Sequence, residues 1–341
     1  MLKKIKMMAM AGVMAVGVAT QTQAADVTLR FAHFWPSVAG IHKELFQVWA
    51  DNVKEQSGGD IEVQIFPSAT LAKPPAQYEA VKNRIADVTA TVQGYTANRF
   101  PLTQIVELPG LVQTAKQGSC MIQGLYDEGL ISDEYKDTKP LMFFTHGPGH
   151  IHTGEKIVKT PEDLAGLRIR RPTAVVAKML EELKAKPVGM PAPESYQSMQ
   201  RGVIDGVALP YEGMAAFRLN ELAKNHTEVG GLYVLSFVIT MNKDVYNALS
   251  ADQKKVIDDN SGKAWSEIAA KVFDKMDVIG RKAAVDGGHN IFTVEGGAEN
   301  PAWKPILAKA TESYLAELEE KGLPARKVYA RAQELSQSCR K

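Results

Sequence analysis

The sequence lacks the short motifs of the common enzyme classes. It contains no Walker phosphate loop, GxSxG, HExxH, CxxC or dinucleotide-type GxGxxG. It also lacks an excess of charge of one sign, with 40 Lys and Arg against 39 Asp and Glu, and it has no basic tail. Nucleic-acid binding is therefore not indicated. A secreted hydrolase, for example one that uses His150 and an acid, stays an alternative, because a nucleophile–base pair cannot be read from spacing.

Long apolar runs are also missing, since no stretch after the first 24 residues reaches the 18 or so that a membrane helix needs. The start itself has three lysines among its first six residues, an apolar run over Met7–Ala19 and a small-residue site that ends at Ala24. This order is typical of a secretory signal peptide. We predict that residues 1–24 are removed and that the mature protein is secreted.

Cysteine is scarce, and Cys120 and Cys339 are the only two. In an oxidising compartment they could form a disulfide. The geometry of a disulfide is strict, and the sequence does not say whether the two residues are close in space. The pairing is therefore left open.

What is present is a regular alternation of strand and helix patterns. Val27–Ala32, Ile61–Ile65 and Asp87–Thr91 are patterned as strands. Ile41–Gln56 and Pro74–Arg84 lie between them and are patterned as helices. Such an alternation predicts an α/β fold with largely parallel pairing.

One helix–strand unit occurs twice. Pro75–Ala90 aligns without a gap with Pro193–Ala208, about 118 residues further on. Chance similarity of two such units is one interpretation. The other is two lobes built to the same plan, each with a strand end at a shared cleft, where ligands commonly bind.

A long helix is predicted after Ser250, where Ser250-Ala-Asp-Gln253 forms a capping box. Apolar residues recur at helical spacing until Gly287-Gly288. About 36 residues would make a helix of about 54 Å, long enough to run across two lobes.

The stretch Gly166–Pro210 opens with a basic strand in which Arg168, Arg170 and Arg171 fall within four residues. A basic sheet edge in water is one interpretation. However, GLRIRRP followed by MPAPESYQSMQRGVIDG resembles the periplasmic solute-binding proteins of tripartite ATP-independent periplasmic (TRAP) transporters, the DctP-like family. The resemblance implies a two-lobed periplasmic binding protein fold, each lobe a mixed sheet flanked by helices, with a long helix spanning both. It places residues 25–147 and 236–275 in lobe I and residues 148–235 and 276–341 in lobe II.

The resemblance also implies the binding residues. Arg170 matches the family arginine that binds the ligand carboxylate, by a planar fork that can donate two parallel hydrogen bonds. His150 stands where many members have a second arginine. The further positions that match cleft residues of the family are Phe34, Trp35, Gln93, Thr173, Ala192, Leu209 and Lys73. Core packing is an alternative for Phe34, Trp35 and Leu209.

The function implied is that of a binding protein, not an enzyme, which uses no cofactor and delivers an organic acid to the membrane permease subunits of a TRAP transporter. A binding protein for another transporter type is an alternative. The single strong anion site and the apolar Leu209 favour an apolar or aromatic monocarboxylate. If Lys73 reaches the cleft, a dicarboxylate or keto acid becomes the alternative. His146, His150 and His152 could instead bind a metal, but no metal site is predicted.

Overall fold

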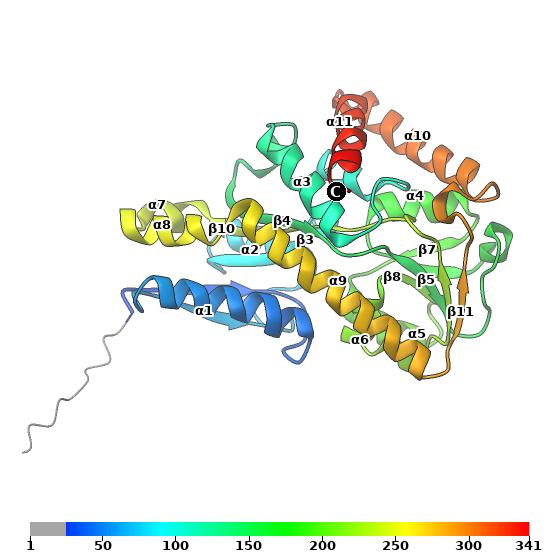
Figure 1. Cartoon of the computed structure of the whole chain (residues 1–341), viewed down its shortest axis with the longest axis horizontal. Coiled ribbons are helices and arrows are strands. Elements are labelled where there is room, and N and C mark those ends of the chain that lie inside the picture. Colours follow the sequence, from blue (N-terminus) through cyan, green and yellow to red (C-terminus); the bar gives the residue numbers. More distant parts are fainter. Residues whose placement is uncertain (1–24, 341) are drawn as a thin grey trace, which may run out of the picture.

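The computed structural model describes residues 25–340, and the predicted signal peptide lies outside them. Two β-sheets lie side by side, with helices around them and one long helix, α9, running from one to the other (Figure 1). In the part of the chain described, no helix is both long and apolar enough to cross a membrane.

The first sheet is mixed. Its strand order is β2-β1-β3-β10-β4, in which β1 to β3 are parallel and β10 is antiparallel to both of its neighbours. The strands are β1 (Val27–Ala32), β2 (Ile61–Phe66), β3 (Val88–Val92), β4 (Thr138–Thr145) and β10 (Ser236–Asn242). We call this sheet and the helices packed on it lobe I.

The second sheet is mixed as well. Its strand order is β11-β9-β5-β8-β6-β7, with β5 antiparallel to both β8 and β9. The strands are β5 (His150–Thr153), β6 (Arg168–Arg171), β7 (Lys186–Gly189), β8 (Gly206–Leu209), β9 (Asn225–Glu228) and β11 (Asn290–Thr293). This sheet and its helices form lobe II.

Most of the helices connect strands along the chain and pack on the sheets. The helices are α1 (Gln47–Gln56), α2 (Gln77–Lys82), α3 (Ala115–Asp127), α4 (Ala174–Glu182), α5 (Ser195–Gln200), α6 (Tyr211–Ala216), α7 (Lys243–Ala248), α8 (Ala251–Asp259), α9 (Gly262–Asp286), α10 (Lys304–Glu320) and α11 (Ala325–Ser338). Short 3₁₀ turns precede or follow several of them, among them η3 (Gln93–Tyr95), η4 (Thr103–Glu107) and η7 (Ala192–Glu194). The predicted α/β fold with two mixed sheets and a long helix across both is confirmed.

The two lobes repeat one plan. In each sheet the order β2-β1-β3 matches β7-β6-β8, and an arginine on the middle strand pairs with the aspartate that precedes the third strand. Arg30 Nε lies 2.9 Å from Asp87 Oδ2, and Arg168 Nε lies 3.0 Å from Asp205 Oδ2. Each aspartate also accepts the backbone N–H of its arginine. Arg168 therefore holds two strands of lobe II together and meets its anion within the protein.

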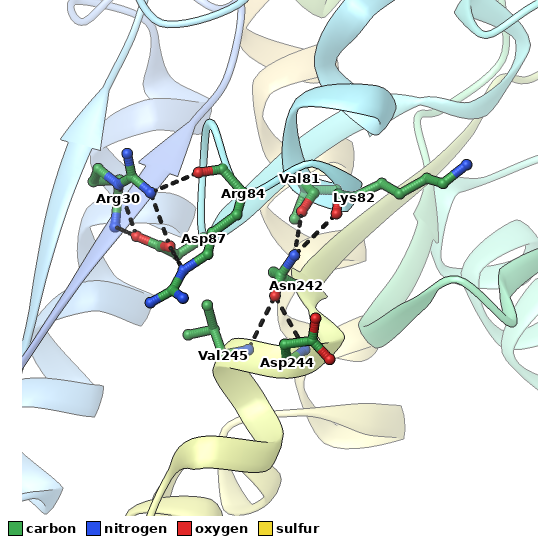
Figure 2. A network of polar contacts seen from close by, with 8 residues as sticks. All are labelled: Arg30, Val81, Lys82, Arg84, Asp87, Asn242, Asp244 and Val245. Atoms are coloured by element: carbon green, nitrogen blue, oxygen red, sulfur yellow. Dashed lines mark hydrogen bonds and ion pairs between the residues drawn. The ribbon is translucent and has the colours of Figure 1, made fainter.

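Figure 2 shows the lobe I version of this network. The guanidinium of Arg30 donates to the carbonyl of Arg84 as well as to Asp87, just as Arg168 donates to the carbonyl of Gly202 in lobe II. Gly202 has a positive φ of 68°, and Arg84 has the same left-handed conformation at φ 57°. The repeated unit thus extends to the backbone conformation of the turn.

Helix α9 is shorter than predicted. The pattern from Ser250 onward forms two helices, α8 and α9, instead of one. The break falls at Asn260, whose carbonyl accepts the indole N–H of Trp49 at 2.8 Å, and at Gly262, whose φ is positive. The 25 residues of α9 still span about 37 Å.

Two aspartates, one helical turn apart on α9, each hold the start of a helix from a different lobe. Asp274 accepts the backbone N–H of Ala115 at the start of α3, and Asp277 accepts that of Glu212 near the start of α6. A carboxylate satisfies the free N–H groups of a helix start and complements its partial positive charge. Helix α9 is thereby bonded to both lobes.

The C-terminal helices also contact both lobes. Helix α10 packs on α4 of lobe II, and α11 packs on α3 of lobe I (Figure 1). Cys120 of α3 and Cys339 form a disulfide with a Cα–Cα distance of 5.9 Å. The pairing that the sequence left open is therefore made. The exact lobe boundaries given above stay predictions.

Candidate ligand-binding site

A small cavity lies where strand ends of the two lobes face each other. Its volume is about 20 Å³, room for about one water molecule. Its lining residues come from both lobes and are mostly aromatic or aliphatic. They are Phe34, Trp35, Val92, Tyr95, His146, Ala192, Leu209, Pro210, Glu212, Gly213, Phe217, Leu235 and Phe237.

Larger hollows exist elsewhere. One of about 630 Å³ lies within lobe II beside the Arg168–Asp205 pair, and one of about 360 Å³ lies beside α10. Neither lies where strand ends of the two lobes face each other. We place the candidate site at the smaller cavity because of the chemistry of the residues around it.

Arg170, the predicted carboxylate ligand, is fully buried beside this cavity. Its Nε donates to the carbonyl of Met190, its Nη1 to that of Ala208 and its Nη2 to the hydroxyl of Tyr95, at 3.0, 3.0 and 2.9 Å. A guanidinium has five N–H donors. These contacts use three of them, which leaves one N–H on each Nη atom for a further acceptor.

Arg170 has no carboxylate partner among the residues that the structure describes. A buried charge without a counter-ion is costly, far more so than a buried neutral group. Its three acceptors hold the guanidinium in place but carry no negative charge. The site is therefore built to take an anion.

Tyr95 joins the two lobes at this point. It lies at the end of η3 in lobe I, and its hydroxyl accepts from Arg170 and from the backbone N–H of Ala192 in lobe II, the latter at 3.0 Å. Both contacts use the oxygen as acceptor, so the hydroxyl proton remains available to a ligand. A carboxylate bound here would receive hydrogen bonds from Arg170 and Tyr95 together.

The lobe I side of the cavity is an aromatic cluster. Phe34 and Trp35 stack with centroids 3.9 Å apart, and Trp35 lies 5.7 Å from Phe237. Phe34 also faces Phe217 of lobe II at 6.4 Å. Such faces pack well against a flat ring or an alkyl chain.

Two polar side chains complete the lining. His146 is buried, with Nδ1 bonded to the carbonyl of Gly147 and Nε2 accepting from the N–H of Leu235. Burial lowers the pKa of His146 to about 3, so it is neutral at pH 7. Burial, together with the nearby Asp277, raises the pKa of Glu212 to about 8, against a hydrogen bond from Trp35.

Five of the predicted residues meet at this site. Phe34, Trp35, Ala192 and Leu209 line the cavity, and Arg170 adjoins it through Tyr95. Whether they contact a ligand stays a prediction.

The other four predicted residues lie elsewhere. The side-chain amide of Gln93 donates to Tyr135 inside lobe I at 2.6 Å. His150 is buried beside Tyr211, and burial lowers its pKa, so it is not a cation at pH 7. Lys73 is exposed on the loop before α2. The hydroxyl of Thr173 donates to Glu107 at 2.7 Å.

The Thr173 contact is a second link between the lobes. Glu107 belongs to η4 in lobe I and also accepts from the hydroxyl and N–H of Ser236. Close by, a Cβ added to Gly94 would come within 2.4 Å of the Thr173 methyl group. Only glycine leaves room for the lobes to approach this closely.

Sequence reasoning missed Tyr95 and Glu212. Tyr95 lies two residues beyond Gln93, after the same strand. Glu212 lies two residues beyond Pro210, where the internal repeat, extended by four residues, aligns it with Gly94. The repeat thus marks the position of Glu212 after a strand end, but it gives this residue no role.

The three neighbouring histidines do not share a site. His146 lines the cavity, whereas His152 bonds through Nδ1 to His226 and through Nε2 to the carbonyl of Leu209. Within residues 25–340 no group of three or more potential metal ligands is found.

The structure has two lobes, each a mixed sheet with helices around it, and a buried arginine and an apolar cavity lie between them. These features define a two-lobed solute-binding protein. The sequence matches the family described as bacterial extracellular solute-binding protein, family 7 (DctP), over residues 31–317, and the chain belongs to this family. The resemblance to the solute-binding proteins of TRAP transporters is thus confirmed.

Solved structures agree. One is a TRAP solute-binding protein from an unidentified marine microbe, specific for aromatic acids and solved with 3-hydroxybenzoate. It is 37% identical to this chain, and the match has a TM-score of 0.90 and covers 93% of this chain and all of that one. One from Rhodoferax ferrireducens with copurified benzoate is 36% identical, with a TM-score of 0.87 over 92% and 98% of the two chains. A relative found by sequence, the C4-dicarboxylate-binding periplasmic protein DctP of Rhodobacter capsulatus, is 24% identical over 74% of this chain and 76% of that one.

Proposed function

We propose that this protein is a periplasmic receptor that binds an aromatic monocarboxylate between its lobes and delivers it to the membrane subunits of a TRAP transporter. It acts by binding, without catalysis. The observation that carries the proposal is Arg170, a buried cation beside an aromatic cavity, with two free N–H groups and no counter-ion in the described part of the chain. The relatives described above that were solved with benzoate and 3-hydroxybenzoate support it.

The charges around the cavity favour one carboxylate over two. Among the described residues, Arg170 is the one permanent cation found beside the cavity, because His146 is neutral and Lys73 is exposed on a loop. A second carboxylate would be buried in the closed site without a cation to pair with it. Burying an unpaired charge costs so much free energy that it is rarely seen in proteins. The dicarboxylate and keto acid alternatives are therefore less favoured.

The apolar lining favours a ring over a sugar. Phe34, Trp35 and Phe217 offer faces, while Leu209 and Val92 offer no hydrogen bond. Each ligand hydroxyl left without a partner would cost about 1–3 kcal/mol. The cavity is much smaller than a benzoate ring, so the lobes or the lining side chains must move apart for entry. Opening and closing of two lobes about hinges allows this.

A ligand panel tests the proposal. The chain from residue 25 onward is measured by thermal shift and calorimetry against benzoate, 3-hydroxybenzoate, mandelate, succinate and glucuronate. A ligand at about 1,000 times its Kd adds about 4 kcal/mol of stability, or roughly 6 °C in Tm for a protein of this size. We expect this for the aromatic acids alone. Tight binding of succinate or glucuronate, with no binding of the aromatic acids, would contradict the proposal.

A further inference from the structure

Glu212 is a buried carboxyl group that the carboxylate-binding role of the site does not explain. It is 6% exposed and lines the cavity, and its Oε1 has no hydrogen-bond partner within the described part of the chain. A buried polar atom without a partner is costly, and such atoms are uncommon in folded proteins.

The other polar groups of the lining are already engaged. Both ring nitrogens of His146 have backbone partners, and the Tyr95 oxygen accepts twice. The free proton of Tyr95 lies at the Arg170 end, where the ligand carboxylate is expected. Among the described lining residues, Glu212 Oε1 is thus the buried side-chain polar atom left to meet a polar group on the body of the ligand.

We propose that Glu212 is a specificity residue that selects an aromatic acid carrying a ring hydroxyl. This inference rests on the proposed function, since it names the substituent that the same cavity recognises. A phenolic hydroxyl both donates and accepts, so it can bond to Oε1 whether the carboxyl group is neutral or ionised. Burial keeps Glu212 mostly protonated at pH 7, which avoids repulsion between it and the ligand carboxylate.

Ligand substitution and residue substitution together test this pairing. Dissociation constants are measured by calorimetry for benzoate and for 3- and 4-hydroxybenzoate, on the wild-type chain and on Glu212→Met. We expect the wild type to bind the better hydroxybenzoate at least about 10-fold more tightly than benzoate. In Glu212→Met this ratio should fall to about 1.

Two controls separate recognition from folding. Glu107→Gln alters another buried carboxyl at the lobe contact, one that already accepts from Thr173 and Ser236, and should leave the hydroxyl ratio unchanged. If Glu212→Met does not fold, 3-methylbenzoate on the wild-type chain replaces it. The methyl group has nearly the size of the hydroxyl but no hydrogen bond, and it should bind at least about 10-fold more weakly than 3-hydroxybenzoate.

The outcomes distinguish the two proposals. If the wild type binds benzoate but the hydroxyl ratio is the same in Glu212→Met, or 3-methylbenzoate binds as well as 3-hydroxybenzoate, the Glu212 inference is wrong and the proposed function stands. If the wild type binds none of these aromatic acids, the proposed function fails and the inference falls with it.

Discussion

Replacing Tyr95 by phenylalanine removes one oxygen from the contact between the lobes. In the wild type this oxygen accepts from Arg170 Nη2 at 2.9 Å and from Ala192 N at 3.0 Å. Without it, two buried donors lose their acceptor when the lobes close, and a carboxylate ligand loses the Tyr95 proton. In an open form, water can reach both donors, so the cost falls mainly on the closed, ligand-binding form.

The magnitude follows from the two donors. An unpaired buried donor costs about 1–3 kcal/mol, and one of these two is charged. Allowing for some relaxation of the guanidinium, we expect a loss of about 2–4 kcal/mol, which is about 30- to 1,000-fold in Kd. The fold itself should be retained, because the ring of Tyr95 stays and continues to pack near Phe34.

Calorimetry with 3-hydroxybenzoate measures this effect, with Tyr246→Phe as the matched control. The Tyr246 hydroxyl donates to Asp258 at the exposed surface, 2.7 Å away, and Tyr246 lies on α7 and does not line the cavity. The control should bind as the wild type does. If Tyr95→Phe binds within about twofold of the wild type, the hydroxyl does not link closure to binding, and the reasoning from these two contacts is refuted.

Three further predictions concern the arginine, the disulfide and pH. Arg170→Ala should weaken binding at least about 30-fold by calorimetry, and Arg170→Lys substantially, since truncating one partner of a buried charge pair costs about 2–5 kcal/mol. Arg171→Ala is the control and should bind with nearly wild-type affinity. If Arg171→Ala loses binding while Arg170→Ala keeps it, the wrong arginine was chosen. Replacing Cys120 and Cys339 by serine should lower the free energy of unfolding by about 2–5 kcal/mol in urea titrations, because the bond closes a very long loop. An unchanged urea midpoint would contradict this. All seven histidines have a pKa lowered by burial in the folded chain. Their contribution to the free energy of unfolding is therefore fully present above pH 6.5 and is lost as the pH falls below it. Fewer buried carboxyl groups, among them Glu107 with a pKa of about 7, act in the opposite direction. The urea midpoint should therefore decrease when the pH is lowered from 7 to 5. An increase would show that the effect of the carboxyl groups is the larger one.

The sequence was sufficient for the fold because its patterns are local and repeated. Strand alternation located β1 to β3, and two lobes of one plan were one of the two interpretations of the aligned repeat. The long helix was overextended because the capping box of Ser250 and the apolar stripe give no sign of a break. The break depends on contacts of Asn260 with α1, more than 200 residues away in sequence.

The site was only partly predictable for the same reason. Arg170 was predicted from the resemblance of GLRIRRP to the family motif, whereas the direction of a side chain at a strand end depends on its neighbours. Gln93 points to Tyr135 within its own lobe, and Thr173 meets Glu107 of the other. Tyr95 and Glu212 acquire their roles only when the two lobes face each other, which no local pattern reports.

A crystal structure of the chain from residue 25 onward with 3-hydroxybenzoate would test the central claim most directly. We predict one molecule between the lobes, with its carboxylate accepting from both Nη atoms of Arg170 and from the Tyr95 hydroxyl, and its ring among Phe34, Trp35 and Phe217. A carboxylate bound at another cation, or a ligand outside the cleft between the lobes, would contradict the account.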